Sequence, residues 1–545
     1  MTEHANRNSS ATPEAPGMSH RSRFTKVYKF GGSSVANAER MREVANIICL
    51  FPEEAPIVVL SAMGKTTNNL ILAGEEAVEC KSTQVKDLEP LKAIQELHAA
   101  TMDELDVDDA TRTQVDELLN ELSQLLIGIS LLKDLTPRSM DSLVSFGERM
   151  STRIFSGYLR QLGIPSMQHD AFDLGIITTD QFTNGDVLYD ESIAQVRTNL
   201  VRMRKRSEIF GSQGSNDHAD GDADAAVSDA SEMLPVLPVV TGFLGLGEKT
   251  GAITTLGRGG SDLTATFLGM ALGINEVIVW KDVDGVLTTD PRICPAASPI
   301  PLLTVDEATE LAYFGATVLH PQSMQPLLEK EKLRAKEEEG EVSRHSSSTT
   351  AGHNLADDDN TFRVCVKNSY NPNAPGSIIC AGSRDMSDTL LTSIVLKSGV
   401  NMLDIVSTRM LGQYGFLSKV FGVFEELQIS VDVVATSEVS VSVTLDISKI
   451  WARDLKNEEL QVLEDSFQGL ATVELKTNRT IISLIGNAER SNEILEKTFG
   501  VLHSLDVNPE MISKGAFKNN IALIVPEEDG NRCLQKLHDT FFEHN

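Results

Sequence analysis

The strongest constraint on the fold is a pair of short buried runs, each ending in glycine and separated by a helix, near the start of the chain. TKVYKFGGSS (25–34) is β-rich and ends at a double glycine, and the residues after it repeat apolar side chains at helical spacing. APIVVLSAMG (55–64) is then almost continuously apolar, as is typical of a strand buried on both faces. This strand–helix–strand unit predicts a parallel α/β sheet, whose ligands bind beyond the C-terminal strand ends.

Later segments extend the same alternation. Long amphipathic helices are predicted over much of 66–134, and another helix is predicted to begin near Asp141. Further buried strands are expected in GIPSMQHD (163–170), LPVVTGFLG (237–245) and INEVIVWKDVDGV (274–286). The expected fold class is therefore α/β, with a mainly parallel central sheet between helices that extends over residues 25–388.

Three polar segments lack apolar periodicity and are predicted to be disordered: a leader over 1–24 and insertions at 207–233 and 334–360. The formal net charge is −30, and the acidic insertions contribute much of it. Nucleic acid and anionic membranes need clustered Lys and Arg, so neither is an expected partner. No stretch approaches the roughly 20 apolar residues that a membrane-spanning helix needs.

The six cysteines show no CxxC or metal-finger spacing, which favours reduced, structural thiols in a cytoplasmic protein. The leader has no apolar core of a secretory signal, although a plastid transit peptide remains the alternative. The basic cluster RMRKR (202–206) resembles a nuclear signal, but it ends an amphipathic helix, where cations complement the helix dipole. The helix-end interpretation is preferred.

The chain after about residue 390 changes to a repeated pattern of strands and helices. Residues 399–478 read as βαββαβ, and residues 479–545 read as βαββα with the last strand missing. The unassigned strand at 390–398 is expected to complete the second sheet. The first small domain (399–478) would then be an insertion within the second (389–398 plus 479–545).

Several motifs offer candidate anion sites. KFGGSS (29–34) joins a strand end to a helix start, so its amides and Lys29 can receive a phosphate. TLGRGGSD (255–262) forms a second such turn, whereas GFLGLG (242–247) lacks dinucleotide spacing and is interpreted as a turn. MGKTT imitates a P-loop, but Val59 stands where the first glycine is required. The histidines His98, His169 and His320 are interpreted as structural.

Six segments together closely resemble, in order, the motifs of aspartate kinases in the amino-acid kinase superfamily. They are KFGGSS, LSAMGKTTN (60–68), FGERMST (146–152), GRGGSD, WKDVDGVLTTDPR (280–292) and GATVLHPQSM (315–324). The C-terminal repeats are similar to the ferredoxin-like ACT domains of monofunctional, plant-like, lysine-sensitive members. The resemblance implies phosphorylation of L-aspartate by ATP with Mg²⁺, at the first step of lysine, threonine and methionine synthesis, in a homodimer or larger homo-oligomer.

The resemblance also implies roles for individual residues. The phosphoryl group would be held by Lys29, Gly31, Gly32 and Ser33, with Asp262 orienting Lys29. Aspartate would be bound by Ser61, Thr67, Glu148, Arg258 and Ser261, with Glu148 facing its ammonium and Arg258 its carboxylate. The nucleotide pocket would be lined by Lys281, Asp282 and Arg292. The chain departs from the family pattern at Leu287 and Thr317, so no adenine or phosphate contact is carried over to these two positions.

The regulatory residues are expected at a strand-to-helix turn of the first repeat, whose amides would receive an effector carboxylate. They are Met410, Gln413, Gly415, Phe416 and Leu417, with Asp432, Ser437 and Glu438 for its ammonium groups. The three apolar side chains also suit a core. The resemblance implies lysine as inhibitor, with S-adenosylmethionine as a possible second effector.

Two alternatives stay open at this stage. Another acyl or carbamate kinase of the same superfamily is disfavoured by FGERMST and the ACT-like repeats, and a fusion to homoserine dehydrogenase is not expected after the second repeat. A catalytically dead amino-acid sensor is disfavoured by the presence of Lys29, Glu148, Arg258 and Asp262.

Overall fold

The structure is a computed structural model that describes most, but not all, of the chain. The described residues are 24–211, 236–316, 319–332, 361–382, 384–407, 414–427, 429, 431–437, 439–445, 457–467, 471–514 and 519–542. The predicted leader, the insertion at 334–360 and most of the insertion at 207–233 lie outside them. Helix α7 (Tyr189–Gly211) includes residues 207–211 of the expected first insertion.

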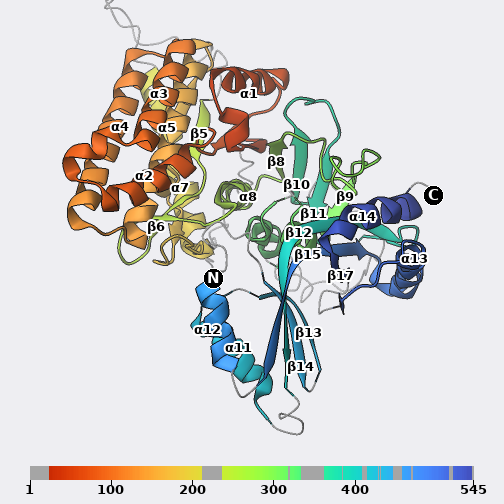
Figure 1. The fold of residues 1–545 in the computed structure, drawn as a ribbon. Helices are drawn as coiled ribbons and strands as arrows, with labels where there is room; N and C mark the ends of the chain where they lie inside the picture. The colour runs from red at the N-terminus through yellow and green to blue at the C-terminus, as the bar shows by residue number, and fades with distance from the viewer. Residues whose placement is uncertain are drawn as a thin grey trace, which may run out of the picture.

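An eight-stranded sheet forms the centre of the N-terminal part (Figure 1). Its strands, in spatial order, are β3 (Ser166–His169), β5 (Leu237–Thr241), β2 (Pro56–Leu60), β1 (Lys26–Phe30), β8 (Glu276–Lys281), β10 (Arg363–Asn368), β11 (Ser377–Cys380) and β9 (Leu302–Thr304). The first six are parallel, and β11 runs antiparallel to β10. The carboxyl ends of β5, β2, β1 and β8 therefore meet at one edge.

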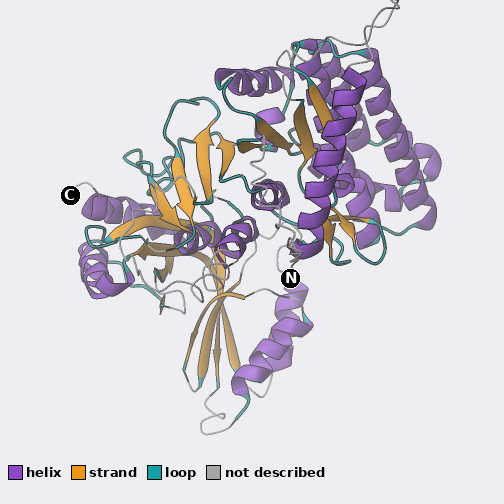
Figure 2. Cartoon of the chain, turned by 180° about the vertical axis from the view of Figure 1, so that it is seen from behind, coloured by secondary structure: helices purple, strands orange, loops and turns teal. Residues whose placement is uncertain are grey.

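Helices cover both faces of this sheet (Figures 1 and 2). They include α1 (Ala38–Leu50), α2 (Thr66–Glu79), α3 (Glu89–Glu104), α4 (Asp109–Leu132), α5 (Pro137–Gln161), α6 (Ala171–Leu174), α8 (Gly260–Leu272) and α9 (Val305–Tyr313). Helix α5 begins four residues before the expected start at Asp141, because Thr136 accepts a hydrogen bond from the amide of Ser139 and Pro137 suits the first helical position.

Side chains of β1 alternate between two hydrophobic cores. Val27 belongs to the core that contains α8, whereas Tyr28 and Phe30 belong to the core formed with α1 to α5. Neighbouring side chains of a strand point to opposite faces, so Lys29 lies on the α8 side with Val27. The alternation therefore directs this lysine towards the helix whose first turn carries Asp262.

A small sheet lies beside the main one and corrects one expectation. GFLGLG was interpreted as a turn, but Leu244–Gly247 form strand β6, which pairs with β4 (Ile177–Thr178) and β7 (Ile253–Thr255). Its glycines are required by close packing, since a Cβ on Gly245 would lie 2.5 Å from the methyl of Thr178.

The C-terminal repeats share one six-stranded sheet instead of forming two separate ones. Its strands, in spatial order, are β13 (Val431–Thr436), β14 (Ser440–Leu445), β12 (Leu391–Val406), β15 (Thr472–Gly486), β17 (Asn520–Pro526) and β16 (Met511–Ser513). Strands β12 and β15 are long and pair along both halves, with register shifts near Val400. Residues 391–397 pair with 481–486, in the half that also contains β17 and β16.

Each half of this six-stranded sheet, which lies in the repeats expected to be regulatory and is called the regulatory sheet below, has its own helices and core (Figures 1 and 2). Helices α11 (Phe416–Glu426) and α12 (Asn457–Phe467) accompany the half with β13 and β14. Helices α13 (Ser491–Ser504) and α14 (Glu527–Phe542) pack on the half with β16 and β17. The division of the chain at residues 389, 399 and 479 stays a prediction.

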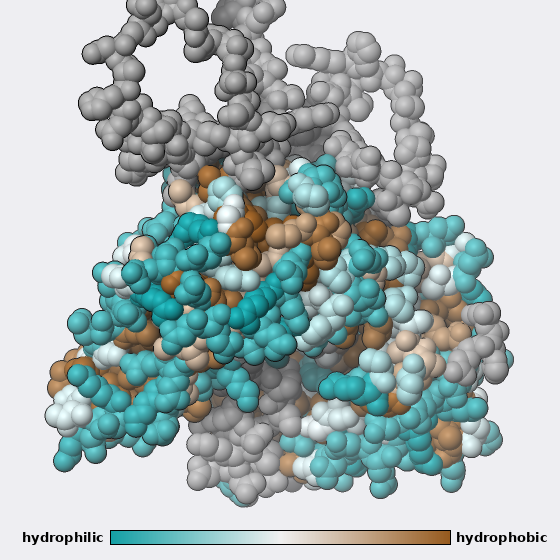
Figure 3. Space-filling view, turned by 90° about the horizontal axis from the view of Figure 1, so that it is seen from above, coloured by the Kyte–Doolittle hydropathy of each residue, from teal (hydrophilic) through white to brown (hydrophobic). Residues whose placement is uncertain are grey.

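The polarity of the described surface and helices bears on whether this part of the chain could enter a bilayer. On the face shown in Figure 3, hydrophilic residues cover most of the described surface and hydrophobic residues form smaller patches. None of the helices in the described ranges combines the length and apolar character needed to cross a bilayer.

Candidate active site

A buried ion pair marks the edge where the parallel strands end. The Nζ atom of Lys29 lies 2.6 Å from Oδ1 of Asp262, and both residues are more than nine-tenths buried. Lys29 is the fourth residue of β1, and Asp262 is in the first turn of α8. The two glycine-rich turns that follow β1 and precede α8 are thereby brought together.

Lys281 adds a second positive charge at this place. It is the last residue of β8, the strand next to β1. Burial lowers the pKa of Lys281, Asp262 opposes this effect, and the positive charge of Lys29 lowers the pKa further. The carboxylate of Asp282 also opposes the shift. Two lysines therefore lie within the electrostatic range of Asp262, and this pair of cations suits a ligand that brings negative charge, such as phosphate.

The turn after β1 packs tightly against the turn after β2. The amide of Gly64 donates a 3.0 Å hydrogen bond to the carbonyl oxygen of Gly32. A Cβ on Gly32 would lie only 2.8 Å from the carbonyl oxygen of Ala62, whereas one on Gly31 would have ordinary contacts, the nearest at 3.6 Å to Nζ of Lys29. Gly32 is thus required by the approach of the two backbones.

Replacing Gly32 by alanine is expected to lower the Tm by several degrees, because overpacking of this kind costs about 1–3 kcal/mol. Gly31→Ala is the matched control and should melt close to the unmodified protein, since its backbone (φ −77°, ψ 171°) accepts any residue. Differential scanning calorimetry of both variants checks the expectation. Equal melting of the two variants would contradict the tight packing of the turns.

Glu148 is buried beside this group, and burial disfavours its charged form. It lies in the middle of α5 and is 4% exposed. Burial raises its pKa to about 8, although the amide of Ala62 and the charge of Lys29 favour the carboxylate. Its Oε2 atom has no hydrogen-bond partner among the described residues. An incoming ammonium group would supply the missing donor and charge.

The neighbouring helix contacts hold Glu148 against the turn that follows β2. The hydroxyl of Ser151 donates a 2.8 Å hydrogen bond to the carbonyl oxygen of Ser61. A Cβ on Gly147 would lie 2.7 Å from the Cβ of Ala62, so only glycine allows α5 to come this close. FGERMST therefore positions a carboxylate against SAMGKTTN.

Three other predicted substrate residues lie on the turns around this group. Ser261 follows the GRGG turn and packs against Gly242, the residue after β5. A Cβ on Gly242 would lie 2.5 Å from the Cβ of Ser261. Arg258 lies close enough to His320 for its charge to lower the pKa of that histidine. Thr67 is in the first turn of α2, directly after the SAMGK turn.

Arg292 does not join this group. Its side chain is 88% exposed and pairs with Asp290 at 2.7 Å. The next residue, Ile293, accepts a hydrogen bond from Gln535 of α14, so this part of the loop lies against the regulatory region. Asp282 is exposed and follows Lys281 directly. The sequence could not show whether Arg292 faces the site or solvent, because the loop that carries it packs against α14 at the far end of the chain.

His320 was interpreted as structural, yet it lies against the site. A Cβ on Gly259 would sit 2.1 Å from the Cβ of His320, which explains the glycine, and its φ of 75° also favours glycine. Burial lowers the pKa of His320, and Arg258 lowers it while Asp262 opposes the shift. The signal in the sequence was its place in GATVLHPQSM, one of the six motifs.

The predicted effector residues are only partly described, because Met410, Gln413 and Glu438 lie outside the described residues. Gly415 precedes α11 with a φ of 88°, Phe416 is buried, and Leu417 is 41% exposed. The remaining two have partners within the chain: Asp432 pairs with Lys397 at 2.5 Å, and Ser437 bonds Ser440. An effector ammonium at Asp432 would therefore share this carboxylate with Lys397.

Comparison with known proteins agrees with this geometry. The profile of the Amino acid kinase family matches residues 25–334, more than half of the chain, and an ACT domain profile matches residues 482–541. Aspartokinase 1, chloroplastic, from Arabidopsis thaliana is 53% identical over 520 residues, covering 95% of this chain and 80% of the relative. The chain belongs to the aspartokinase family.

Other aspartokinases match over nearly the whole length. Lysine-sensitive aspartokinase 3 of Escherichia coli is 32% identical over 525 residues, covering 95% of this chain and 99% of the relative. The crystal structure of E. coli aspartokinase III in complex with lysine and aspartate superposes with a TM-score of 0.72 at 30% identity, over 95% of this chain and 99% of that one. The predicted fold class and the predicted aspartokinase family are confirmed.

Proposed function

We propose that this aspartokinase transfers the γ-phosphoryl group of ATP to the side-chain carboxylate of L-aspartate, forming 4-phospho-L-aspartate and ADP. The observation that carries the proposal is the buried pair of Lys29 and Asp262, with Lys281 close by and Glu148 beside it. A positive centre for phosphate and an anion for an ammonium group thus lie in one place. The E. coli relative solved with aspartate and ADP supports it.

The reaction needs charge neutralisation more than proton transfer. The aspartate side chain, with an ordinary pKa of about 3.9, is already an anion at neutral pH, so no general base is required. One of its oxygens forms a bond to the γ-phosphorus while the bond from that phosphorus to the β–γ bridging oxygen breaks. Lys29 and Lys281 would reduce the repulsion between the two anions, and Asp262 would hold Lys29 in place.

The remaining residues would position the substrates. The amides of Gly31, Gly32 and Ser33 would face the phosphoryl group. Glu148 would receive the aspartate ammonium, Arg258 its α-carboxylate, and Ser61, Thr67 and Ser261 would complete the pocket. Mg²⁺ on the ATP phosphates would supply further positive charge. Asp262 fits such an ion, although the described residues contain no cluster of three or more metal-ligating side chains.

An assay that couples ADP release to NADH oxidation, with and without L-aspartate, tests the proposal. Release of ADP that depends on L-aspartate is expected. L-Glutamate and carbamate serve as alternative acceptors, and a preference for either would instead favour another kinase of the superfamily. A protein that binds aspartate without releasing ADP would be a sensor, which would overturn the proposal.

We further propose that lysine inhibits the enzyme through the regulatory sheet. The support is the E. coli relative named lysine-sensitive and its structure with lysine, described as the T-state. Lysine must then bind the less active state more tightly. At millimolar concentration, lysine should lower the rate several-fold and raise the Tm, while threonine and S-adenosylmethionine tested in parallel show whether the effect is specific. If lysine changed neither the rate nor the Tm, the proposed regulation would be contradicted.

Two further proposals concern the assembly and its location. Paired regulatory sheets of this kind would join two copies of the chain, and a homodimer is therefore proposed, to be measured by light scattering with and without lysine. The Arabidopsis relatives are named chloroplastic, which supports the plastid alternative over the cytoplasm. Imaging of the chain with a C-terminal fluorescent tag would distinguish the two compartments.

A further inference from the structure

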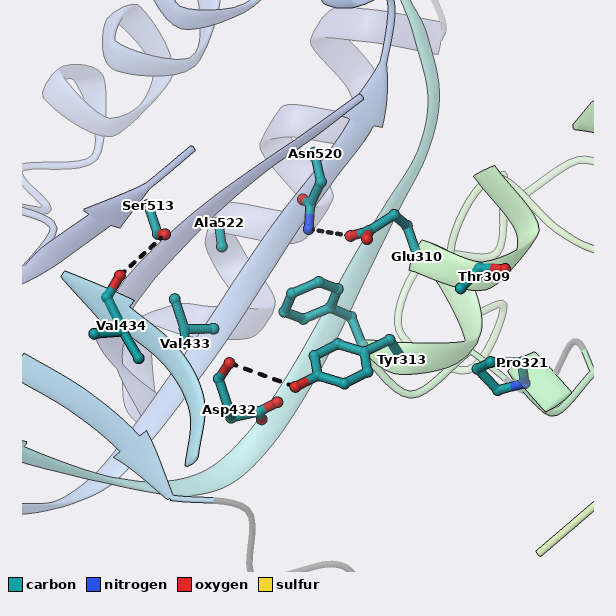
Figure 4. Close-up of a pocket in the computed structure, with 11 residues that line it drawn as sticks. Thr309, Glu310, Tyr313, Pro321, Asp432, Val433, Val434, Ser513, Asn520 and Ala522 are labelled. Atoms are coloured by element: carbon teal, nitrogen blue, oxygen red, sulfur yellow. Dashed lines mark hydrogen bonds between the residues drawn. The ribbon is translucent and has the colours of Figure 1, made fainter. Parts of the chain in front are cut away.

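A cavity of about 480 Å³ lies between helix α9 and the regulatory sheet (Figure 4). Its lining residues are Thr309, Glu310, Tyr313, Phe314 and Pro321 on one side, and Asp432, Val433, Val434, Ser513, Asn520 and Ala522 on the other. The first group comes from the catalytic part and the second from strands β13, β16 and β17. The volume is within the range of about 300–1,000 Å³ that is usual for small-molecule sites.

The two walls are held together by polar contacts that flank the cavity. Glu307 of α9 pairs with Arg384 at 2.8 Å and accepts a hydrogen bond from Thr392 of β12. One turn later, Glu310 accepts a 2.7 Å hydrogen bond from the side-chain amide of Asn520 on β17. The cavity is therefore a built space at a fixed junction and not a gap between loosely placed parts.

The cavity offers hydrogen-bond acceptors without a matching cation. Glu310 and Asn520 are 6% and 7% exposed, and Oδ1 of Asn520 has no hydrogen-bond partner among the described residues. Among the residues that the structure describes, the only hydrogen-bond partner of the Glu310 carboxylate is the neutral amide of Asn520, and burial raises the pKa of Glu310. None of the described lining residues is Lys, Arg or His, and the nearby Lys397 is paired with Asp432, the other carboxylate of the lining. A ligand that donates hydrogen bonds and carries positive charge would satisfy this lining.

The rest of the lining suits an apolar body. The ring centroids of Phe314 and Tyr313 lie 5.2 Å apart in an edge-to-face arrangement. Val433 and Ala522 lie on the opposite wall (Figure 4). Aromatic rings also attract cations over their faces. A free amino acid fits less well, because none of the described lining residues is cationic and the nearby Lys397 is already paired with Asp432.

We propose that this cavity binds a small protonated amine with an aromatic or aliphatic body at Glu310 and Asn520, separate from the effector turn before α11. Asp432, an expected effector residue that also lines the cavity, stays paired with Lys397. The ammonium group contacts Glu310 and Asn520, and the apolar body lies between Tyr313 and the β13–β17 wall. Because the ligand touches both walls, its binding stabilises the junction between the catalytic part and the regulatory sheet.

The test uses the full-length protein and a pair of probes that differ only in charge and donor capacity. Phenethylamine should bind in isothermal titration calorimetry and raise the Tm, whereas the neutral 2-phenylethanol should bind at least about tenfold more weakly, the scale of losing a charge-assisted hydrogen bond. Equal affinities for the two probes, or binding of neither at millimolar concentration, would overturn the proposal. Competitive displacement of the amine by L-lysine would show that the site is not separate.

Variants locate the binding. Glu310→Gln keeps the shape and an acceptor for Asn520, and it should weaken phenethylamine at least about tenfold. Glu96→Gln, an exposed substitution on α3 far from the cavity, is the matched control and should bind as the unmodified protein does. Ala522→Leu fills the cavity from the opposite wall and should abolish binding. This second variant tests the site independently if Glu310→Gln folds poorly. Unchanged affinity in both cavity variants refutes the site, whatever the catalytic activity is found to be.

Discussion

Replacing Lys29 by alanine is expected to lower kcat at least about a hundredfold, the scale of losing one preorganised electrostatic donor. Lys29 is the cation paired with Asp262 at the end of β1, and the proposed reaction brings two anions together at this place. The loss should appear mainly in kcat, because the charge between attacking and leaving groups is greatest in the transition state. Steady-state kinetics of ADP release measures it.

The matched control is Lys26→Ala on the same strand. Lys26 pairs with Glu54 and Glu276 at the opposite end of β1, so its loss should leave kcat within a few-fold. Removing Lys29 alone takes away the nearest cation of the buried Asp262, and breaking a buried ion pair in this way typically costs about 3–5 kcal/mol. The double variant with Asp262→Asn relieves that cost and should remain inactive. Near-normal turnover in a folded Lys29 variant would exclude the proposed role.

Glu148→Gln is expected to raise the KM for L-aspartate about a hundredfold or more while making the ligand-free protein more stable. Breaking a buried charge pair with a ligand costs about 2–5 kcal/mol, which sets the scale of the KM change. The gain in stability follows from burial, which raises the pKa of this carboxyl to about 8 and so disfavours its charged form in the absence of ligand. Kinetics and calorimetry on the same preparation measure both effects.

The pH dependence of the two proteins should differ in a predictable direction. Only the carboxylate form of Glu148 attracts an ammonium group, so the KM for aspartate should fall as pH rises towards about 8 and then level. The folded state holds a proton that the unfolded chain has released, so Glu148 should make stability fall between about pH 4.5 and 8. Glu148→Gln removes both slopes.

Glu75→Gln, an exposed substitution on α2, is the control for these measurements and should leave KM and Tm unchanged. If Glu148→Gln retained the aspartate affinity of the unmodified protein, the ammonium-binding role would be wrong. A lower Tm in that variant would show instead that the carboxylate stabilises the empty site.

Local patterns were sufficient for the main parallel strands and for the motifs at their ends, although they missed strand β6. The alternation Val27, Tyr28, Lys29, Phe30 and the glycines after it already imply a buried strand whose lysine reaches the edge of the sheet. They could not show that Lys281 would lie near Lys29, because that depends on β8 pairing beside β1. Nor could they show that His320 lies against Gly259, since a histidine in a loop has no period to reveal its neighbour.

The regulatory region shows the same limit at a larger scale. Each strand and helix of the repeats was expected from its own pattern, yet β12 and β15 run without interruption through both halves and join them into one sheet. Apolar alternation identifies a strand but does not determine where its hydrogen bonding to a neighbour ends. The continuation past the repeat boundary is decided by the partner strand.

From its sequence alone, this chain could be assigned an α/β catalytic part, two regulatory repeats and the family to which it belongs, because these depend on short-range periodicity and on ordered motifs. Only the tertiary structure decided that Lys29 meets Asp262, that Glu148 is buried, that Arg292 faces solvent and that a cavity separates α9 from the regulatory sheet. Burial, charge pairing and the shape of a cavity arise between residues far apart in the chain, so no local pattern contains them.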